Sequence, residues 1–415
     1  MEEAVVISGI SDLALYINTR LKALGFRSKL VTVGYQGQDP SVVNLSIIHY
    51  WVDFLLQRFR SFVFRYIILN VDKKYHYYQD INEDKHYFPV RTLLNKIGKP
   101  KCIFILFNYR LLTSNSIRII WEKTNATIFL LMPDMALITG GCSYSWDCKN
   151  YQNGCGNCPA IQNFSRKKMA SETLYKKIKN LNGIKLLPLV FSSEQKAQAD
   201  GSLLFKSQNA IKCFFPIDEH IFKPGDMSRE RSYLKLPQDA KIILFGAQNV
   251  FDKRKGFGEL KEAIKMLIKM KRIQKLHLIV AGRTGKSLDD ISSLVPTTEV
   301  GLLNHEMLSR IYRAANLFVC PSLADSGPTM VNQSLLCGTP VVAFDVGVAI
   351  DLIKNGETGY LVKDRSSSGL AAGINNFFRQ SQSDQKEFRK NCIKARRHMI
   401  KFGFFNVIKS CIKQQ

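Results

Sequence analysis

The chain has 415 residues, of which 46% are hydrophobic and 22% charged, and its formal net charge is +25. This composition is that of a folded globular protein and excludes a disordered or low-complexity chain. The length predicts two or three domains, because single cores stop growing at about 300 residues. The positive charge favours anionic partners, namely nucleic acid, an anionic membrane leaflet or a phosphorylated substrate, and does not choose among them.

The N-terminal sequence predicts no secretion signal. "MEEAVVISGI" is acidic and lacks a basic region followed by a long apolar core. No stretch reaches the roughly 18 apolar residues that a membrane-spanning helix needs. We therefore expect a cytoplasmic protein, whose thiols stay reduced and for which a disulfide knot is the weaker interpretation.

The N-terminal third predicts a strand, a helix and a second strand in succession. The apolar run "AVVISG" ends at Gly9, and "SDLALYINTRLKALG" follows as a helix that Ser11 or Asp12 can cap and Gly25 can end. "SKLVTVG" is the next strand, and "KCIFILFN" and "ATIFLLM" are later ones. A strand, helix and strand within about 35 residues form the building block of a parallel sheet.

Residues 58–70, "RFRSFVFRYIILN", interleave basic and aromatic side chains. The basic residues are Arg58, Arg60 and Arg65, and the aromatic ones are Phe59, Phe62, Phe64 and Tyr66. One interpretation is a helix or strand packed on the sheet, with arginines whose stems lie along apolar surface while their charges reach water. The other interpretation is a patch that rests on an anionic membrane surface.

The C-terminal half repeats the alternation of strands and helices. Strands are predicted at "KIILFGA", "KLHLIVAG", "LFVCPS" and "TPVVAFDVG", and helices at "GELKEAIKMLIKM", "EMLSRIYRAA" and "PTMVNQSLLCG". The polar stretch 225–240 precedes this series, so we place a domain boundary there, with domains at 1–224 and 225–380 and a basic helical tail at 381–415. Two doubly wound α/β halves imply a cleft, and ligands bind at the carboxyl ends of the strands that face it.

Residues 321–347 predict a strand, a glycine-containing loop, a helix and a further strand. Pro328 suits the first turn of the helix, whose free N–H groups form an anion site. These N–H groups lie near Gly327, Thr329 and Met330. Asp325 precedes the turn, and Gln333 lies one helical turn in, on a face that can look into the cleft. Taken alone, the pattern is equally that of an ordinary strand-to-helix connection.

The same segment resembles the signature of the family 4, or group 1, glycosyltransferases of GT-B fold. "DSGPTMVNQSLLCGTPVV", from Asp325 through Gln333, has the length and ending of their pattern of two glutamates separated by seven residues. "FFPIDEHIFKP", "FGAQNVFDKRKGFGEL", "IYRAANLFVCPS" and "IKNGETGYLV" are similar to further motifs of the family, and together they cover about residues 205–365. The resemblance implies two Rossmann-like doubly wound domains that face a cleft.

The resemblance also implies transfer of a sugar from a nucleotide-sugar donor, with retention of anomeric configuration and no cofactor required for catalysis. It assigns Asp325 to the transferred sugar, and Lys255 with Arg254 to the diphosphate. It assigns Gln333, which replaces the second glutamate, to the ribose, and Ala247 stands where the family has an arginine. The donor-binding candidates are Arg254, Lys255, Asp325, Ser326, Gly327, Thr329, Met330 and Gln333. The catalytic candidates are Asp134, Asp325 and Lys255.

A second resemblance starts at Pro133. There "PDMALITGGCSYSWDC" and the later "CGNCP" keep the frame of a run in the subgroup that builds bacterial surface polysaccharides of the colanic-acid and O-antigen types. Asp134 is retained, whereas Pro133 and Ser143 stand where the subgroup has histidines. The subgroup implies a lipid-linked or polysaccharide acceptor, and Gly9, at the end of the first strand, is assigned to the acceptor-side loop.

Four cysteines, Cys142, Cys148, Cys155 and Cys158, have the spacing C-x5-C-x6-C-x2-C. The final pair forms a knuckle, and two more thiolates from nearby chain can close a tetrahedral four-thiolate site, which predicts a structural zinc ion without an open position for catalysis. Unpaired reduced cysteines are one alternative. Redox or disulfide chemistry is another.

These observations leave three functions. The first is a glycosyltransferase of bacterial surface polysaccharide synthesis, such as lipopolysaccharide or capsule, peripheral at the inner face of the cell membrane, where its charge attracts a nucleotide diphosphate and an anionic leaflet. The second, motivated by Pro133, Gln333 and Ala247, is a degenerate GT-B protein that binds a nucleotide or a partner without catalysis. The third is a nucleic-acid-binding protein with a zinc module. Its basic residues are scattered and no nucleic-acid-binding motif accompanies them, so we expect no nucleic-acid partner.

Overall fold

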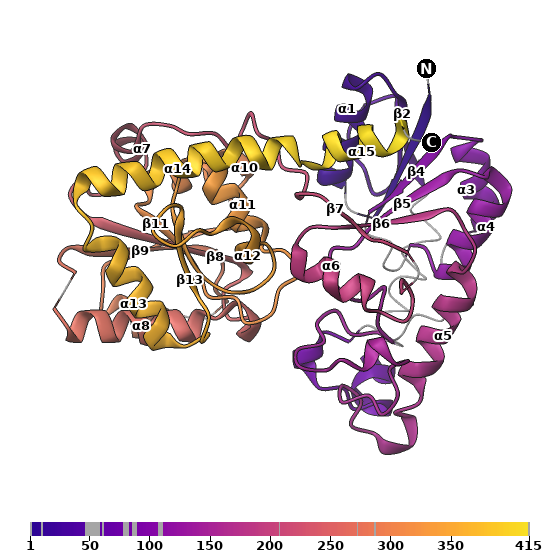
Figure 1. The fold of residues 1–415 in the computed structure, drawn as a ribbon, viewed down its shortest axis with the longest axis horizontal. Coiled ribbons are helices and arrows are strands. Elements are labelled where there is room, and N and C mark those ends of the chain that lie inside the picture. The colour runs from indigo at the N-terminus through magenta and orange to yellow at the C-terminus, as the bar shows by residue number, and fades with distance from the viewer. Residues whose placement is uncertain are drawn as a thin grey trace. The chain divides into compact units, whose positions relative to one another are not determined.

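The computed structural model describes residues 2–9, 11–45, 59, 62–77, 83–84, 89–106, 111–206, 208–271, 273–285 and 288–413. The chain divides into two compact units, which Figure 1 shows as ribbons. Unit 1 comprises Met1–Phe191 and Gln195–Pro216, and unit 2 comprises Ser192–Glu194 and Ile217–Gln415. The division after Pro216 lies slightly before the predicted boundary at residue 224, and the predicted tail groups with unit 2.

Unit 1 is built on a parallel sheet that has seven strands among the described residues. In sheet order they are β3 (Val42–Leu45), β2 (Arg27–Val33), β1 (Glu3–Ser8), β4 (Cys102–Ile105), β5 (Thr127–Leu131), β6 (Leu186–Val190) and β7 (Ile211–Lys212). Because β1 pairs in parallel with β2 across α1 (Ser11–Ala23), the predicted N-terminal strand–helix–strand unit is confirmed. Gly25 has a φ of +92°, as expected for a glycine that ends a helix. Further helices among the described residues are α3 (Val90–Ile97), α4 (Ser114–Thr124), α5 (Met169–Leu181) and α6 (Ser193–Asp200), of which Ser193 and Glu194 group with unit 2.

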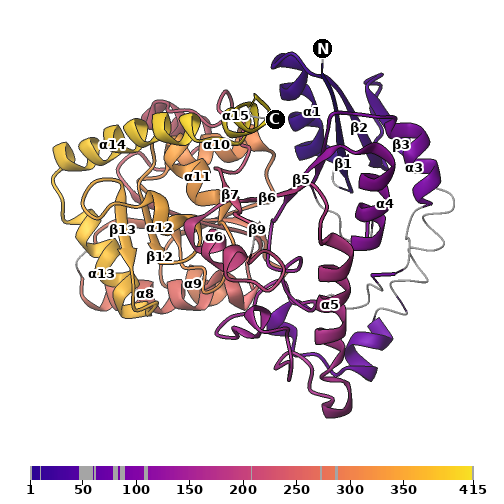
Figure 2. The ribbon, with the colours of Figure 1, turned by 45° about the vertical axis from the view of Figure 1, so that its right-hand side comes forward.

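Unit 2 repeats this architecture with a second parallel sheet. In sheet order its described strands are β10 (Thr297–Gly301), β9 (Leu276–Arg283), β8 (Lys241–Asn249), β11 (Leu317–Cys320), β12 (Val341–Phe344) and β13 (Gly359–Val362). The helices α8 (Phe257–Lys269) and α13 (Ser367–Phe378) cover one face of the sheet (Figures 1 and 2). The other face is covered by α10 (His305–Ala314), α11 (Thr329–Leu336) and α14 (Gln382–Lys401). Shorter helices are α9 (Asp289–Ser292), α12 (Val348–Leu352) and the terminal α15 (Phe404–Lys413).

The central strands are continuous apolar runs because helices bury both faces of each sheet. Every residue of β4 and β5 is buried, and so is every residue of β11 and β12. Within unit 1, the rings of Phe104 and Phe129 stack on neighbouring strands with centroids 4.8 Å apart. The runs that the sequence analysis assigned to strands therefore form the core of each unit.

In both sheets the strand order reverses at one position, between β1 and β4 in unit 1 and between β8 and β11 in unit 2. The loops that leave the carboxyl ends of such strands diverge to opposite sides, which is where open α/β sheets bind ligands. In unit 2 the two diverging loops are residues 250–256 and 321–328. In unit 1 the corresponding position after β1 begins at Gly9.

The polar stretch 225–240, predicted as a boundary between domains, is part of unit 2. It contains α7 (Met227–Tyr233), whose first turn is capped by Asp226, which accepts a hydrogen bond from the N–H of Arg229 at 2.7 Å. Arg231 is buried and donates hydrogen bonds to the carbonyl of Ala314 at 2.9 Å and to that of Gln238 at 2.7 Å. Although much of the segment is exposed, Arg231 ties it to the rest of unit 2 by satisfying backbone carbonyls.

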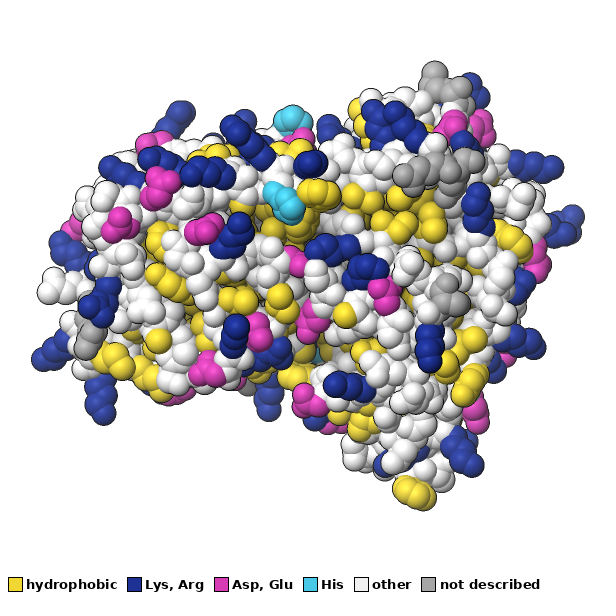
Figure 3. All heavy atoms as spheres, viewed as in Figure 1, with side chains coloured by type: hydrophobic (Ala, Val, Ile, Leu, Met, Phe, Trp, Pro, Cys, Tyr) yellow, Lys and Arg dark blue, Asp and Glu magenta, His cyan; other side chains and the backbone are white. Residues whose placement is uncertain are grey.

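Residues 63–68 form the π-helical segment η1 (Val63–Ile68), whereas Arg58 and Arg60 lie outside the described residues. Among the helices described here, none combines the length and the apolar character that crossing a membrane requires. On the face drawn in Figure 3, lysine and arginine side chains are dispersed among polar and apolar ones and do not merge into one continuous patch.

Candidate functional site

Two loops of unit 2 meet at the point where its strand order reverses. The loop after β8 forms the single turn η5 (Lys253–Lys255), capped by Asp252, which accepts a hydrogen bond from the N–H of Arg254 at 3.0 Å. The carbonyl of Arg254 in turn accepts from the N–H of Leu323, in the loop after β11, at 2.8 Å. Gly256 ends η5 with a φ of +72°, and a Cβ there would overlap the carbonyl oxygen of Pro321. This close approach requires glycine.

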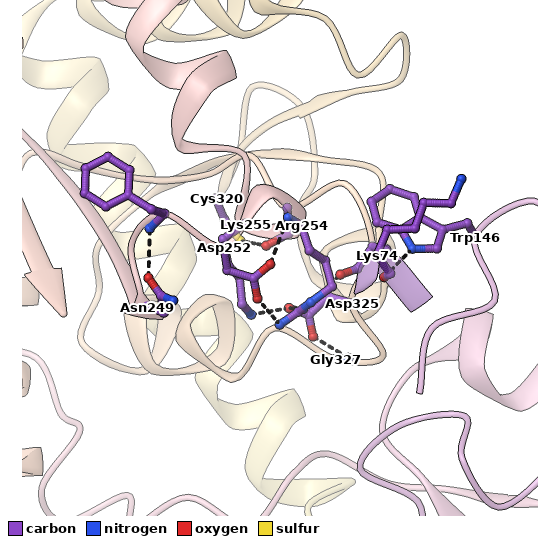
Figure 4. Close-up of polar contacts among 12 residues, drawn as sticks. Lys74, Trp146, Asn249, Asp252, Arg254, Lys255, Cys320, Asp325 and Gly327 are labelled. Carbon is purple, nitrogen blue, oxygen red and sulfur yellow. Dashed lines mark hydrogen bonds and ion pairs between the residues drawn. The ribbon is translucent and has the colours of Figure 1, made fainter. Parts of the chain in front are cut away.

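Asp325 joins the two loops through an ion-pair cluster, drawn in Figure 4. One of its carboxylate oxygens, Oδ2, lies 2.5 Å from Lys255 Nζ and 3.1 Å from Arg254 Nη1. Arg254 also donates to the carbonyl of Ala324 at 2.9 Å and lies 3.2 Å from Asp252 Oδ2. The sequence-predicted residues Arg254, Lys255 and Asp325 are thus brought together, although about 70 residues separate the first two from the third.

The cluster is shielded from water to different degrees. The side chains of Arg254 and Asp325 are 9% and 10% exposed, whereas that of Lys255 is 23% exposed. Burial alone would raise the pKa of Asp325, but the neighbouring Lys255 and Arg254 outweigh it, so the pKa lies below the usual value of 3.8. Asp325 is therefore ionised at neutral pH, and Lys255 is the most exposed member of the cluster.

The charges of this cluster are balanced, because Asp252 and Asp325 face Arg254 and Lys255. An added anion would therefore be held by directed hydrogen bonds and not by a net positive charge. An ammonium group has three N–H donors, and Asp325 uses one of those of Lys255.

The start of α11 supplies further donors beside the cluster. Pro328 was predicted in the first turn of the helix, but the structure makes it the N-cap residue, and α11 begins one position later, at Thr329. The first N–H groups of an α-helix have no partner within the helix. Gly347 fixes the approach of the loop, because its φ is +57° and a Cβ there would lie 3.1 Å from the carbonyl oxygen of Asp325. Ser326 and Gly327 line the same turn, and Gly327 N–H lies 3.4 Å from Asp325 Oδ1.

Two of the predicted donor-binding side chains point into unit 2. Met330 packs against Gly246 of β8, where a Cβ would meet its side chain. Gln333 is buried, with 7% of the residue exposed, and its Oε1 accepts a hydrogen bond from the hydroxyl of Tyr312 at 3.2 Å. Burial raises the pKa of Tyr312 well above 10, so its hydroxyl stays a donor. The expected open face for Gln333 is therefore not observed, because α11 turns it toward α10, and its role at a ribose stays a prediction.

Sequence reasoning missed two residues of this site, Asp252 and Tyr312. Asp252 organises η5, and the available signal was an aspartate two residues before an arginine at a strand end, which is typical of a side-chain-capped turn. Tyr312 lies in the motif "IYRAANLFVCPS", but nothing in that motif indicated its partner, because Gln333 lies on another helix.

The predicted residues of unit 1 lie at the carboxyl edge of its sheet. Gly9 directly follows β1 and is exposed. Asp134 follows β5, is half-buried and accepts a hydrogen bond from the N–H of Ala136 at 2.8 Å. Since β4 lies between β1 and β5, these two residues are placed on separate loops of one edge. Their catalytic and acceptor-side roles stay predictions.

The four clustered cysteines line one cavity in unit 1, together with Tyr75 and Tyr77. All of them are free thiols, three are buried and Cys148 is half-buried. Cys155 accepts a hydrogen bond from the N–H of Gly140 at 3.2 Å, and burial raises the pKa of its thiol to about 11. No three histidine, cysteine or acidic side chains within the described ranges are arranged to hold a metal ion as they stand. Structural zinc at the four cysteines therefore stays a prediction.

A comparison with protein families finds a match within unit 2. Residues 226–399 match the model of the family described as Glycosyl transferases group 1. This segment contains η5, Asp325 and all of α11. The match places the ion-pair cluster in the part of the chain that carries the family pattern.

Curated relatives include two D-inositol 3-phosphate glycosyltransferases. That of Catenulispora acidiphila is 30% identical over 200 residues, which cover 45% of this chain and 47% of the relative. That of Mycobacterium tuberculosis is 27% identical over 230 residues, which cover 52% and 46%. The chain thus spans about half the length of the curated relatives it matches. The family match supports a likeness to group 1 glycosyltransferases. The relatives are named for an inositol phosphate, so they give no particular support to the surface-polysaccharide subgroup.

Solved structures are similar over the whole chain. Sucrose-phosphate synthase from Thermosynechococcus elongatus has a TM-score of 0.68 at 16% identity, covering 100% of this chain and 99% of the other. A structure described as trehalose-6-phosphate from E. coli bound with UDP-2-fluoro glucose has a TM-score of 0.64 at 13% identity, covering 100% of this chain and 98% of the other. At such identities the likeness shows the fold alone. The predicted α/β GT-B fold with two Rossmann-like domains is confirmed.

Proposed function

We propose that this protein is a glycosyltransferase that moves a sugar from a nucleotide-sugar donor, whose diphosphate binds at η5 and the start of α11. The observation that carries the proposal is the Asp325, Lys255 and Arg254 cluster. It lies on the two loops that diverge at the strand-order reversal of unit 2, within the residues that match the group 1 family.

Sugar transfer requires that the negative charge that develops on the leaving diphosphate be stabilised. Transfer breaks the bond between the anomeric carbon and a phosphate oxygen, and the bonding electrons leave with the nucleoside diphosphate. Donors already aimed at the developing charge are often the largest catalytic contribution. Lys255 keeps N–H donors beyond the one given to Asp325, and the first turn of α11 adds backbone donors. Arg254 is engaged with Asp252, Asp325 and the carbonyl of Ala324, so it holds the loops while Lys255 meets the phosphates.

We also propose that transfer retains the anomeric configuration. The acceptor hydroxyl would bond to the anomeric carbon on the face from which the diphosphate leaves, and a phosphate oxygen would take the hydroxyl proton. This route requires no protein base, so the replacement of the subgroup's histidine by Pro133 is compatible with turnover.

For the acceptor we propose a lipid-linked or polysaccharide glycan. The cysteine-rich frame that starts at Pro133 and includes Asp134 supports this class, because it resembles enzymes of bacterial surface polysaccharide synthesis. An inositol or sugar phosphate is the second acceptor class, favoured by the names of the curated relatives. Mass spectrometry of products formed with each acceptor class distinguishes the two.

Thermal unfolding of the full chain with a panel of UDP-, GDP- and ADP-sugars tests the donor site. At about 100 times the dissociation constant, a bound donor stabilises by about 2.7 kcal/mol, which raises the unfolding midpoint by about 5 to 10 °C in a unit of this size. Lys255→Ala should remove most of this shift, because charge-assisted hydrogen bonds contribute about 1.5 to 3 kcal/mol.

Lys253→Ala is the matched control, since it removes the same charge from an exposed lysine of the same turn. The control should keep the shift. No shift with any donor, or equal losses in both variants, would contradict the proposal. Binding of a donor without release of its nucleoside diphosphate in the presence of acceptors would favour the degenerate binding protein instead.

A further inference from the structure

Two separate segments of unit 1, joined by contacts near Asn163, carry exposed aromatic and aliphatic side chains. The first contains η1 and the second is the single turn η4 (Phe164–Arg166). The exposed fractions are 70% for Phe59, 54% for Phe62, 67% for Ile67 and 84% for Phe164. We call these side chains, together with Tyr66, Lys73 and Lys167, the aromatic–basic patch.

Backbone contacts hold the two segments together. The N–H of Asn163 donates to the carbonyl of Leu69 at 3.1 Å, and its side-chain Nδ2 donates to that of Ile68 at 2.8 Å. Val71 and Ile161 form an antiparallel bridge next to these contacts. Leu69, Val71 and Ile161 are buried, so the exposed side chains project from a packed base. The spacing between Phe164 and η1 is therefore set by the fold.

The patch combines this apolar exposure with positive charge. Lys73 Nζ lies 5.6 Å from the ring centroid of Tyr66, and Lys167 Nζ lies 5.7 Å from that of Phe164. Arg166 and Lys168 flank Lys167 in the sequence. Neither 58–71 nor 159–171 contains an aspartate or a glutamate, although the chain as a whole has 34 acidic residues. Acidic residues occur only at the ends of the two segments: Asp72, which lies 3.9 Å from Lys74 Nζ, and Glu172. Between these ends both segments offer cations beside exposed apolar side chains.

We propose that the aromatic–basic patch binds the surface of an anionic lipid bilayer. Aromatic side chains that project among lysines and arginines suit the boundary between headgroups and acyl chains, where the rings enter the bilayer and the cations meet lipid phosphates. A large exposed apolar cluster is otherwise unfavourable for a protein in water. The sequence motif at 58–70 gave this interpretation as one of two, and the structure adds the second segment around Phe164.

Co-sedimentation of the full chain with vesicles tests the proposal. The vesicles contain either about 30% phosphatidylglycerol in phosphatidylcholine or phosphatidylcholine alone, because anionic lipid is what attracts basic surfaces. We expect binding to the anionic vesicles, weakened by about 0.5 M salt, which shortens the screening length severalfold. Phe164→Ser should weaken it by about tenfold or more, since an inserted aromatic side chain carries much of the apolar burial.

Phe402→Ser is the matched control. Phe402 is 43% exposed in unit 2 and has Lys401 over its ring at 5.3 Å, yet it lies outside the patch. The control should bind like the wild type, and both variants should unfold at unchanged temperature. Equal binding to both vesicle types, no binding, or equal losses in the two variants would overturn the proposal. If the patch binds a protein instead of a lipid bilayer, the chain should bind neither type of vesicle. The donor-site experiment is independent of all these outcomes.

Discussion

Replacement of Gly256 by alanine should damage both the stability of unit 2 and its proposed donor site. Gly256 has a φ of +72°, in the left-handed region that costs other residues about 1 to 2 kcal/mol. Its added Cβ would also overlap the backbone carbonyl of Pro321, which cannot rotate away as a side chain could. Overpacking of this kind adds about 1 to 3 kcal/mol. We therefore expect a loss of about 2 to 5 kcal/mol in the free energy of unfolding.

The matched control is Gly258→Ala, two residues later in α8. Nothing lies within 4 Å of a Cβ at Gly258, and it has helical geometry without a positive φ. Alanine should stabilise this position by up to about 1 kcal/mol. Urea unfolding followed by circular dichroism measures both variants. The reasoning is wrong if both substitutions change the free energy of unfolding in the same direction by similar amounts.

Three further predictions concern other parts of the molecule. Because the pKa of Asp325 is lowered on folding, its stabilisation is present above its unfolded pKa of about 3.8 and is lost as pH falls through the folded value. Asp325→Asn should therefore lower the free energy of unfolding at about pH 7 and flatten its decline toward about pH 3, and an unchanged urea-unfolding profile would contradict this. Tyr312→Phe and Gln333→Leu should each cost about 1 to 3 kcal/mol, and the double variant less than their sum, because each single change leaves one buried polar group unsatisfied; additive losses in a double-mutant cycle would contradict it. If the cavity beside Cys155 holds zinc, elemental analysis should give about one metal per chain, lost in Cys155→Ser and kept in the control Cys411→Ser. A stable metal-free protein would refute the metal site.

The strands of unit 2 were predictable where a short apolar run lies between turn residues. β11 and β12 are fully buried runs of this kind, and both occur where predicted. β6 was missed because Pro188 interrupts its run, and proline normally marks an edge or an end. In the structure Pro188 lies inside β6, opposite Leu130 of β5. Pairing with the neighbouring strand β5 decides this placement, and the local sequence around Pro188 carries no information about that pairing.

The proposed donor site shows the same limit of sequence-based prediction. Lys255 and Asp325 could be named from motifs, but their ion pair could not, because it depends on how closely two loops approach. That approach is set by Gly256 against Pro321. The direction of the Gln333 side chain could not be predicted either. Helical periodicity shows which residues share a face of α11, but it does not show which face packs against α10. The contact with Tyr312 decides it.

The most direct measurement is the release of nucleoside diphosphate from the nucleotide sugar that stabilises the protein best. It compares the wild type, Lys255→Ala and Lys253→Ala, with lipid-linked glycan and inositol phosphate acceptors supplied in turn. The account predicts acceptor-dependent release by the wild type and by Lys253→Ala, and a rate reduced by about tenfold to a hundredfold in Lys255→Ala, since one charge-assisted donor contributes about 1.5 to 3 kcal/mol. Release that is absent with every donor and acceptor, or equal in the two lysine variants, would contradict it.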